Sequence, residues 1–224
     1  MSSIRFVAGL ILAAAGAAAL HAALSRPDLG FTTLVSARLV EAYGTRFGGA
    51  VPARLDDWMR FARERKTERS ANERRLLELV NRYLNRIRFE EDSVHWGMTD
   101  YWATPAESVA SNGGDCEDFS IAKYFLLKEL GVPIARLRLV YVKALRLNQA
   151  HMVLAYYAAP DAVPLVLDNL EESVRPATER TDLVPVYTFN DEEVRVVASG
   201  RVSSPRQIRN WTDLVDRLER EART

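Results

Sequence analysis

The single cysteine of the chain, Cys116, is the side chain best suited to nucleophilic chemistry. It falls in the first turn of a helix that we expect Asp115 to open, directly after the turn residues Asn112-Gly113-Gly114. A helix N-terminus stabilises negative charge and therefore favours the thiolate, which is the reactive form of cysteine. A lone cysteine is more often an inert, buried apolar residue, so the groups around Cys116 decide between the two interpretations.

A cysteine nucleophile needs a base that takes its proton and later returns one to the leaving group. Beyond residue 25, the candidates are His95 and His151. His95 lies beside Trp96 in an irregular aromatic segment, where packing or solvent exposure is the expected role. His151 lies on a predicted strand, and Asp168 directly follows the next apolar strand, where a carboxylate could orient the imidazole. Taken singly, both residues are typical of structural positions, but with Cys116 they form a candidate catalytic set.

Acidic residues crowd the cysteine on both sides, at Asp115, Glu117 and Asp118. Nearby carboxylates raise the pKa of a thiol and oppose formation of the thiolate. Acids are favoured in the first turn of a helix, but three of them exceed what capping needs. A bound hard cation such as Ca²⁺, which takes oxygen ligands, would offset the local negative charge. From the residues alone, a simply solvated acidic cluster remains the commoner alternative.

The spacing of apolar residues divides the chain into a helical first half and a strand-rich second half. Apolar residues recur at helical spacing after Pro52 and again over 76–87, where Ser70 and Glu73 form a capping-box pattern. The predicted strands cover 137–142, 151–157, 163–167, 184–189 and 194–198, and a final helix begins at 204–205. Helices followed by strands indicate an α+β fold. A cysteine at a helix start, then a histidine and an aspartate on successive strands, is the order that a papain-like or transglutaminase-like core requires.

Length and composition are those of one globular domain that can bury a real core. The chain has 224 residues, and its 30 basic and 30 acidic side chains give a formal net charge of zero. Neutrality weighs against nucleic-acid binding, which normally leaves a basic footprint. A single cysteine excludes a disulfide framework within the chain.

The first 25 residues differ from the rest. The segment 6–25 carries no charged side chain, follows Arg5 and is rich in alanine, as in a secretory signal peptide. Its length is also close to the ~20 residues that span a bilayer, so an uncleaved N-terminal anchor is the alternative. We therefore expect an exported protein whose domain covers residues 26–224.

Four separated motifs resemble those of the bacterial transglutaminase-like cysteine proteases of the LapG type. They are DYWATP at 100–105, GGDCED at 113–118, AHMVL at 150–154 and LVLDNL at 165–170. The resemblance continues through 186–190 and covers roughly residues 40–200. Any one motif would be a weak signal, whereas four in the right order are specific.

The resemblance implies roles for individual residues. Cys116 would be the nucleophile, His151 the general base and acid, and Asp168 the carboxylate that orients the imidazole. The backbone N–H of Cys116 would help to bind the oxyanion, and Trp102 would contribute to the wall of the substrate site.

The resemblance also implies a calcium site beside the cysteine. Members of the family bind the ion through acids that match Asp115 and Glu117. We extend the expected ligand set to Asp118 and Asn112.

Members of this family are periplasmic endopeptidases that cut a large surface adhesin near its N-terminus, at a di-alanine site, and so release the cell from a biofilm. An inner-membrane receptor sequesters them when cytoplasmic cyclic-di-GMP is high. We therefore expect a periplasmic enzyme with an adhesin substrate and such a receptor as partners. The alternatives are another acyl transferase on the same fold (a transglutaminase or amidase) and a non-catalytic periplasmic binding module.

Overall fold

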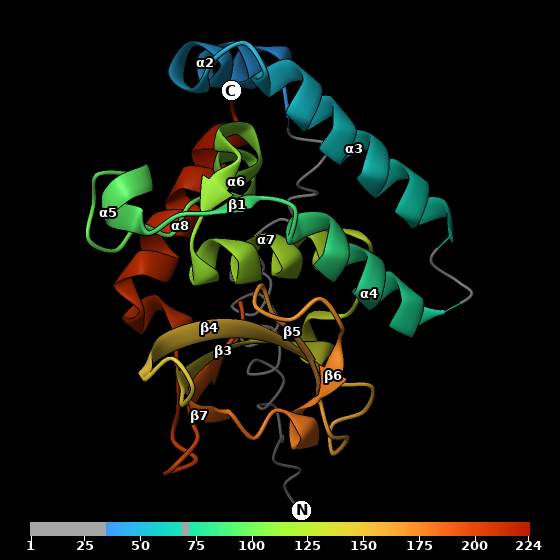
Figure 1. The fold of residues 1–224 in the computed structure, drawn as a ribbon, viewed down its shortest axis with the longest axis vertical. Helices are drawn as coiled ribbons and strands as arrows, with labels where there is room; N and C mark the ends of the chain where they lie inside the picture. The colour runs from blue at the N-terminus through green and yellow to red at the C-terminus, as the bar shows by residue number, and fades with distance from the viewer. Residues whose placement is uncertain (1–34, 69–71) are drawn as a thin grey trace, which may run out of the picture.

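The computed structural model describes residues 35–68 and 72–224, in which helices cover one face of an antiparallel sheet (Figure 1). The expected signal peptide or anchor, residues 1–25, lies outside the described residues. The helices are α2 (Ala37–Phe47), α3 (Val51–Glu68), α4 (Glu73–Leu84), α5 (Asp92–His95), α6 (Pro105–Ser111), α7 (Cys116–Glu129) and α8 (Arg209–Glu221), with 3₁₀ turns η2 (Ile134–Arg136), η3 (Ala177–Glu179) and η4 (Pro205–Gln207). The strands are β1 (Arg88–Phe89), β2 (Gly113–Gly114), β3 (Leu137–Ala144), β4 (Gln149–Tyr156), β5 (Leu165–Leu167), β6 (Arg175–Pro176), β7 (Leu183–Phe189), β8 (Val194–Val196) and β9 (Val202–Ser203).

Among the described residues, seven strands form one sheet in the order β6-β5-β4-β3-β7-β8-β9, and every neighbouring pair is antiparallel. The long strands β3 and β4 pair along their whole length, which places Val142 opposite His151. The shorter β5 pairs only with Leu154–Tyr156 of β4. The first half of β4 therefore has no strand neighbour on its β5 side within the described chain.

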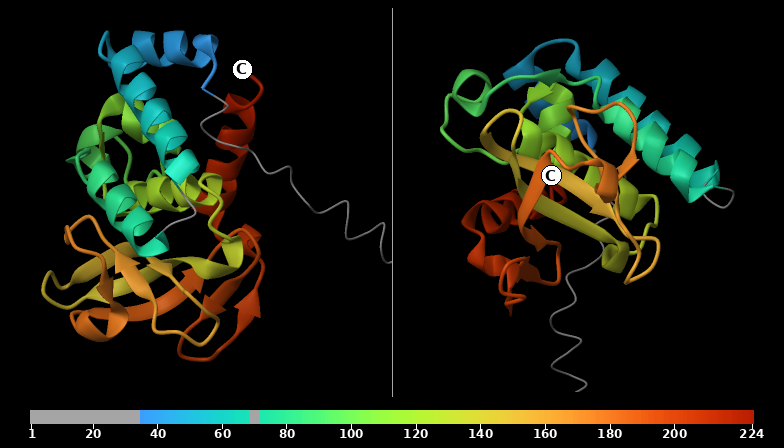
Figure 2. Two further views of the ribbon diagram at one scale, coloured as in Figure 1. Left: turned by 90° about the vertical axis from the view of Figure 1, so that its right-hand side faces the viewer. Right: turned by 60° about the horizontal axis from the view of Figure 1, so that its bottom comes forward.

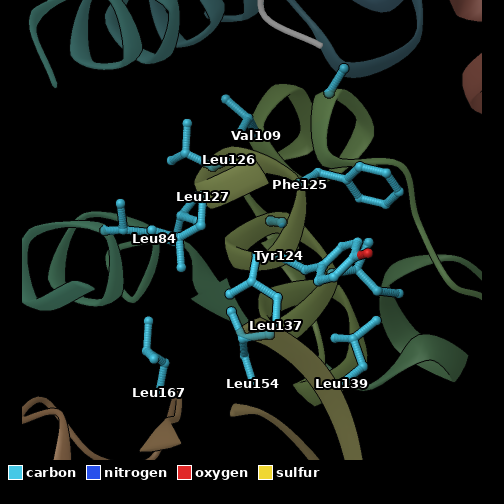
Figure 3. Packing of buried hydrophobic residues seen from close by; sticks show 14 of the residues in the cluster. Leu84, Val109, Tyr124, Phe125, Leu126, Leu127, Leu137, Leu139, Leu154 and Leu167 are labelled. Atoms are coloured by element: carbon cyan, nitrogen blue, oxygen red, sulfur yellow. The ribbon is translucent and has the colours of Figure 1, made fainter. Parts of the chain in front are cut away.

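Helix α7 is the centre of the molecule, because every residue from Asp118 to Leu127 is buried. It contacts β3 and β4 of the sheet and, on its other sides, α4 and α6 (Figures 1 and 2). A helix that is apolar on all sides is typical of such a buried position. Figure 3 shows this packing, with side chains from α7 meeting those of α4, α6 and the sheet. The labelled residues of this core are Leu84, Val109, Tyr124, Phe125, Leu126, Leu127, Leu137, Leu139, Leu154 and Leu167.

The ends of α7 follow from its sequence. Asp115 is the N-cap residue, with φ −109° and ψ −164°, so Cys116 is the first helical residue, as predicted. At the other end Gly131 adopts φ 83°, a left-handed conformation that favours glycine and stops the helix. The fold class, α+β with a helix-borne cysteine on an antiparallel sheet, is confirmed.

Two element starts differ from expectation. The Ser70–Glu73 capping box does not describe α4, because Asn72 is the N-cap and accepts from the backbone N–H of Arg75 at 3.1 Å. Asparagine caps a helix as well as serine, and Glu73 then occupies the first helical position, where an acid is also favoured. The last helix begins at Arg209, since Ser204 caps only the preceding 3₁₀ turn η4.

Within the described part of the chain, no helix combines the length and the apolar character required to cross a membrane.

Candidate functional site

The cysteine helix and the histidine strand are fastened to each other next to the reactive residues. One turn after Cys116, the hydroxyl of Ser120 donates to the carbonyl of Met152 at 2.9 Å. Met152 directly follows His151, and its backbone also hydrogen-bonds the Cys116 sulfur. The start of α7 is thereby held against β4, where His151 lies.

His151 and Asp168 form a buried pair. Nε2 of His151 lies 2.8 Å from Oδ1 of Asp168, and the side chains are 3% and 0% exposed. The same oxygen accepts from the backbone N–H of Leu170 at 3.0 Å, and Oδ2 accepts from Arg180 at 2.8 Å. Burial raises the pKa of Asp168, but the bonds from His151, Leu170 and Arg180 outweigh it and lower the pKa to about 2. Asp168 is therefore a carboxylate at neutral pH, and Nε2 of His151 is committed to it.

A cavity of about 740 Å³ brings the predicted residues to one surface, since Cys116, His151 and Trp102 all line it. Because Nε2 of His151 bonds to Asp168, Nδ1 is the ring nitrogen left to serve a group in the cavity. The structure brings the three candidate catalytic residues together: Cys116 and His151 line one cavity, and Asp168 is bonded to the imidazole.

In this structure the Cys116 thiol is hydrogen-bonded to the carboxylate of Glu117. Sγ of Cys116 donates to Oε2 of Glu117 at 2.7 Å. Burial, with the charge and hydrogen bond of Glu117, raises the pKa of the Cys116 thiol well above its ordinary value, against the opposing backbone bond from Met152. The predicted conflict between the acids and the thiolate is therefore real in the structure.

The acidic cluster is larger than the sequence indicated, because Asp92 and Asp100 join it. Carboxylate oxygens of Asp92, Asp100 and Glu117 lie within 4.8 Å of one another, as do those of Asp92, Asp115 and Asp118. Burial, followed by repulsion from neighbouring acids, raises the pKa of Asp115 to about 10. The pKa of Asp92 rises to about 6, chiefly through burial.

Two oxygens in this cluster are suited to a cation. Oδ1 of Asp92 and Oδ1 of Asp115 are buried and have no hydrogen-bond partner among the described residues. Buried, unpartnered carboxylate oxygens are costly unless a cation satisfies them. Together with Asp100 and Glu117, they form an all-oxygen donor set of the kind that Ca²⁺ prefers.

Two of the expected metal ligands are placed differently. Asp118 is buried in the cluster, but its oxygens already accept from the backbone N–H of Ala103 at 2.7 Å and the indole N–H of Trp96 at 3.3 Å. Asn112 does not line the cavity; it is the C-cap of α6, with φ 57°. Left-handed asparagine at a helix end is explained by capping alone.

The glycine pair between Asn112 and Asp118 allows the side chains of His95 and Asp118 to pack directly against the backbone. Gly113-Gly114 forms β2, which pairs in parallel with β1. A Cβ on Gly113 would collide with the ring of His95, and one on Gly114 would collide with the carboxylate of Asp118. His95 itself bonds to Glu90 at 2.7 Å and Ser111 at 2.9 Å, which confirms its expected packing role.

The described geometry is matched by a known family. The family described as bacterial transglutaminase-like cysteine proteinase (BTLCP) matches residues 58–191, more than half of the 224 residues. The chain belongs to this family. A search among curated proteins gave no match.

Solved structures of LapG from Legionella pneumophila resemble this proteinase along most of its length. The EGTA-treated structure is 36% identical, with a TM-score of 0.71, and the match covers 82% of this chain and 98% of that one. The structure titled calcium-bound is also 36% identical, with a TM-score of 0.69, and the match covers 82% and 99% of the two chains. A third LapG structure is 35% identical, with a TM-score of 0.71, and covers 82% and 96%.

Three residues of the proteinase site were missed by sequence reasoning: Asp92, Asp100 and Arg180. Asp100 begins the DYWATP motif, but the motif alone did not predict that this carboxylate belongs to the acidic cluster. Nothing in the spacing around Asp92 indicates that it lies beside Asp115, and nothing around Arg180 indicates that it bonds to Asp168. Lys123 lines neither the cavity nor the acidic cluster, but it is fully buried on α7, which its sequence context does not distinguish from a solvated helical lysine.

Proposed function

We propose that this proteinase is a calcium-dependent endopeptidase in which Cys116 is the nucleophile, His151 the general base and acid, and Asp168 the orienting carboxylate. The observation that carries the proposal is the His151–Asp168 pair: Nε2 is bonded to Asp168, and His151 lines the same cavity as Cys116, so Nδ1 is the nitrogen available to the thiol. This arrangement matches the role of each member of a Cys-His-acid set.

In the first half of the reaction, Nδ1 of His151 takes the proton of the Cys116 thiol and the sulfur attacks the peptide carbonyl carbon. The carbonyl oxygen becomes an oxyanion, for which the N–H groups at the start of α7 are suitable donors. When the C–N bond breaks, the imidazolium gives its proton to the leaving amine. The acyl group stays on sulfur as a thioester.

In the second half, Nδ1 takes a proton from water, whose oxygen attacks the thioester carbonyl. The C–S bond breaks, the sulfur recovers a proton from the imidazolium, and a carboxylic acid leaves. Throughout, Asp168 holds Nε2 and stabilises the imidazolium without itself being protonated, in keeping with its pKa of about 2.

The donor set of Asp92, Asp100, Asp115 and Glu117 fits a calcium ion. When bound, Ca²⁺ would offset the negative charge beside the thiol and engage the Glu117 carboxylate, which otherwise accepts the thiol hydrogen. The EGTA-treated and calcium-bound titles of the related LapG structures support this assignment.

A polypeptide substrate is supported by the open half of β4. The main chain of Met152 is directed to α7, so by the alternation of strand bonds Ala150 directs its N–H and C=O to the same side. Ala150 lines the cavity and has no strand neighbour on this side within residues 35–68 and 72–224, and the half-exposed Leu147 and Leu170 also line the cavity. An extended peptide can pair with such an edge.

The wider role follows from the family resemblance. We propose that the enzyme acts in the periplasm, cuts a large surface adhesin near its N-terminus at a di-alanine site, and thereby promotes release from a biofilm. An inner-membrane receptor controlled by cyclic-di-GMP would hold it inactive. Small alanine side chains suit a nucleophile that is itself partly buried.

The decisive test is mass spectrometry of products after incubation with a purified N-terminal adhesin segment that contains an Ala-Ala step. We expect two cut fragments with the native chain and none with Cys116→Ala, whose thermal stability should be nearly unchanged. Crosslinked or deamidated products would favour an acyl transferase or amidase instead. Processing by the Cys116→Ala variant would exclude the proposed nucleophile.

Calcium should stabilise the folded protein, because the acidic cluster exists only in the folded state. A calcium concentration 100 times the Kd contributes about 2.7 kcal/mol, which is roughly 5–10 °C for a domain of this size. Differential scanning fluorimetry with calcium or EGTA measures the shift. Asp92→Asn should reduce it strongly, whereas the control Asp161→Asn, at an exposed loop position, should not. Equal melting temperatures with calcium and EGTA would contradict the metal assignment.

A further inference from the structure

Arg180 lies on the loop between η3 and β7 and is almost fully buried, with 8% of its surface exposed. Nε and one terminal nitrogen hold both oxygens of Asp182, each at 3.1 Å, and the same terminal nitrogen donates to Oδ2 of Asp168 at 2.8 Å. Its backbone N–H bonds to the carbonyl of Ala177, and its carbonyl accepts from Leu183. The guanidinium is therefore fixed both through its main chain and through two carboxylates.

The carboxylate of Asp168 divides its two oxygens between different partners. Oδ1 faces Nε2 of His151 and the backbone N–H of Leu170, and Oδ2 faces Arg180. The torsion that turns an aspartate carboxylate is intrinsically broad, so partners must set the plane of this group. The bidentate contact with Asp182 fixes the plane of the Arg180 guanidinium, so its single bond to Oδ2 of Asp168 has a defined direction, which a point charge would not give.

We propose that Arg180 is a positioning residue for the reaction of Cys116. Its bond to Oδ2 turns the Asp168 carboxylate so that Oδ1 meets Nε2 of His151, and the imidazole then presents Nδ1 to the sulfur. This inference rests on the proposed function, since it requires that His151 serves Cys116.

Near Asp168 lies a second basic side chain, which is partly protonated at pH 7 and helps to distinguish an effect of direction from an effect of charge. Lys123 interacts electrostatically with Asp168, but its Nζ has no hydrogen-bond partner among the described residues. If only positive charge near Asp168 mattered, loss of Lys123 would resemble loss of Arg180. If direction matters, loss of Arg180 alone reduces the reactivity of Cys116.

The test measures the rate at which iodoacetamide alkylates the protein at pH 7 with calcium present, by intact-protein mass spectrometry. Because the chain has one cysteine, every added mass reports on Cys116. We expect Arg180→Met to slow alkylation about 10-fold, the lower end of losses for groups that orient a functional ligand. Arg180→Lys, which keeps the charge and loses the fork, should restore part of the rate.

Coupling to Asp168 distinguishes positioning from a general structural effect. In an Asp168→Asn background, Arg180→Met should change the rate less than about 2-fold, since effects that act through one group are not additive. Lys123→Met should leave the rate near that of the native chain. Arg138→Met, which removes another partly buried sheet arginine paired with a carboxylate, Glu193, is the matched control and should also leave it unchanged.

Each outcome decides the inference. A native rate in Arg180→Met, or an equal slowing in the Asp168→Asn background, would overturn it. If Arg180→Met fails to fold, as circular dichroism would show, Arg180→Lys in the two backgrounds carries the same comparison. Native rates in both His151→Gln and Asp168→Asn would instead refute the proposed function, whereas slow rates there with a native rate in Arg180→Met refute the positioning role alone.

Discussion

Lys123 is fully buried on α7, seven residues after Cys116 and therefore on the same side of the helix. Burial lowers the pKa of its ammonium to about 7, against the opposing attraction of Asp168. Below that pH the folded state must hold a desolvated charge, which costs free energy. Lys123 therefore lowers the stability of the core that it occupies.

Lys123→Met should raise the free energy of unfolding at pH 7 by about 1–4 kcal/mol, as apolar replacement of buried charges does. In the native chain the cost is complete below about pH 7 and declines as the pH rises from 7 toward 10.5, because the unfolded state binds the extra proton there. Urea unfolding at pH 7 and pH 9 measures both effects. The control Lys128→Met removes a lysine paired with Asp191 and should destabilise instead. A Lys123→Met chain less stable than the native one at pH 7 would refute the argument.

At the scale of elements, α8 is joined to the start of α6 and to α2 through one carboxylate. Oε1 of Glu221 accepts from Tyr43 at 2.5 Å and from Thr104 at 2.6 Å. Thr104 is also the N-cap of α6, where it forms a capping box with Glu107. Burial, with the nearby charge of Glu107, outweighs these bonds and raises the pKa of Glu221 to about 7.

Because the Glu221 carboxyl titrates near neutral pH, we expect the attachment of α8 to α2 and α6 to depend on pH. Its folded pKa lies above its unfolded value, so the stability linked to its proton is complete below about pH 4.5 and is lost as the pH rises through 7. Glu221→Gln keeps the accepting oxygen and removes the titration. We expect it to flatten the decline in unfolding free energy between pH 5 and 8 by on the order of 1–3 kcal/mol. An unchanged pH profile in this variant, relative to the control Glu219→Gln, would contradict the assignment.

At the scale of the whole molecule, local signals in the sequence predicted the parts that depend on local structure. The start of α7 at Cys116 follows from Asp115 and the glycine turn, and a run rich in β-branched and aromatic residues identified the strand of His151. The starts of α4 and α8 were predicted less well, because Asn72 and not Ser70 caps α4, and because α8 begins at Arg209, after the 3₁₀ turn that Ser204 caps.

Local sequence patterns could not predict the contacts that the fold makes between separate segments. Asp92 joins the acidic cluster because the parallel pairing of β1 with β2 brings the segment before α5 against the start of α7. Arg180 reaches Asp168 because β6 pairs with β5 and turns the chain back through η3. Neither pairing has a periodic pattern, since both involve only two residues on each strand. Tertiary structure alone reveals these residues.

The central claim is that folding brings a helix-borne thiol and a strand-borne imidazole together so that sulfur can lose its proton to the ring. The most direct measurement compares iodoacetamide alkylation of Cys116 in His151→Gln and His95→Gln, with calcium present at pH 7. General-base assistance is worth about 10²–10⁴-fold, so we predict that His151→Gln reacts at least about 100-fold more slowly than the native chain and that His95→Gln reacts at the native rate. Equal rates in the two variants would contradict the account.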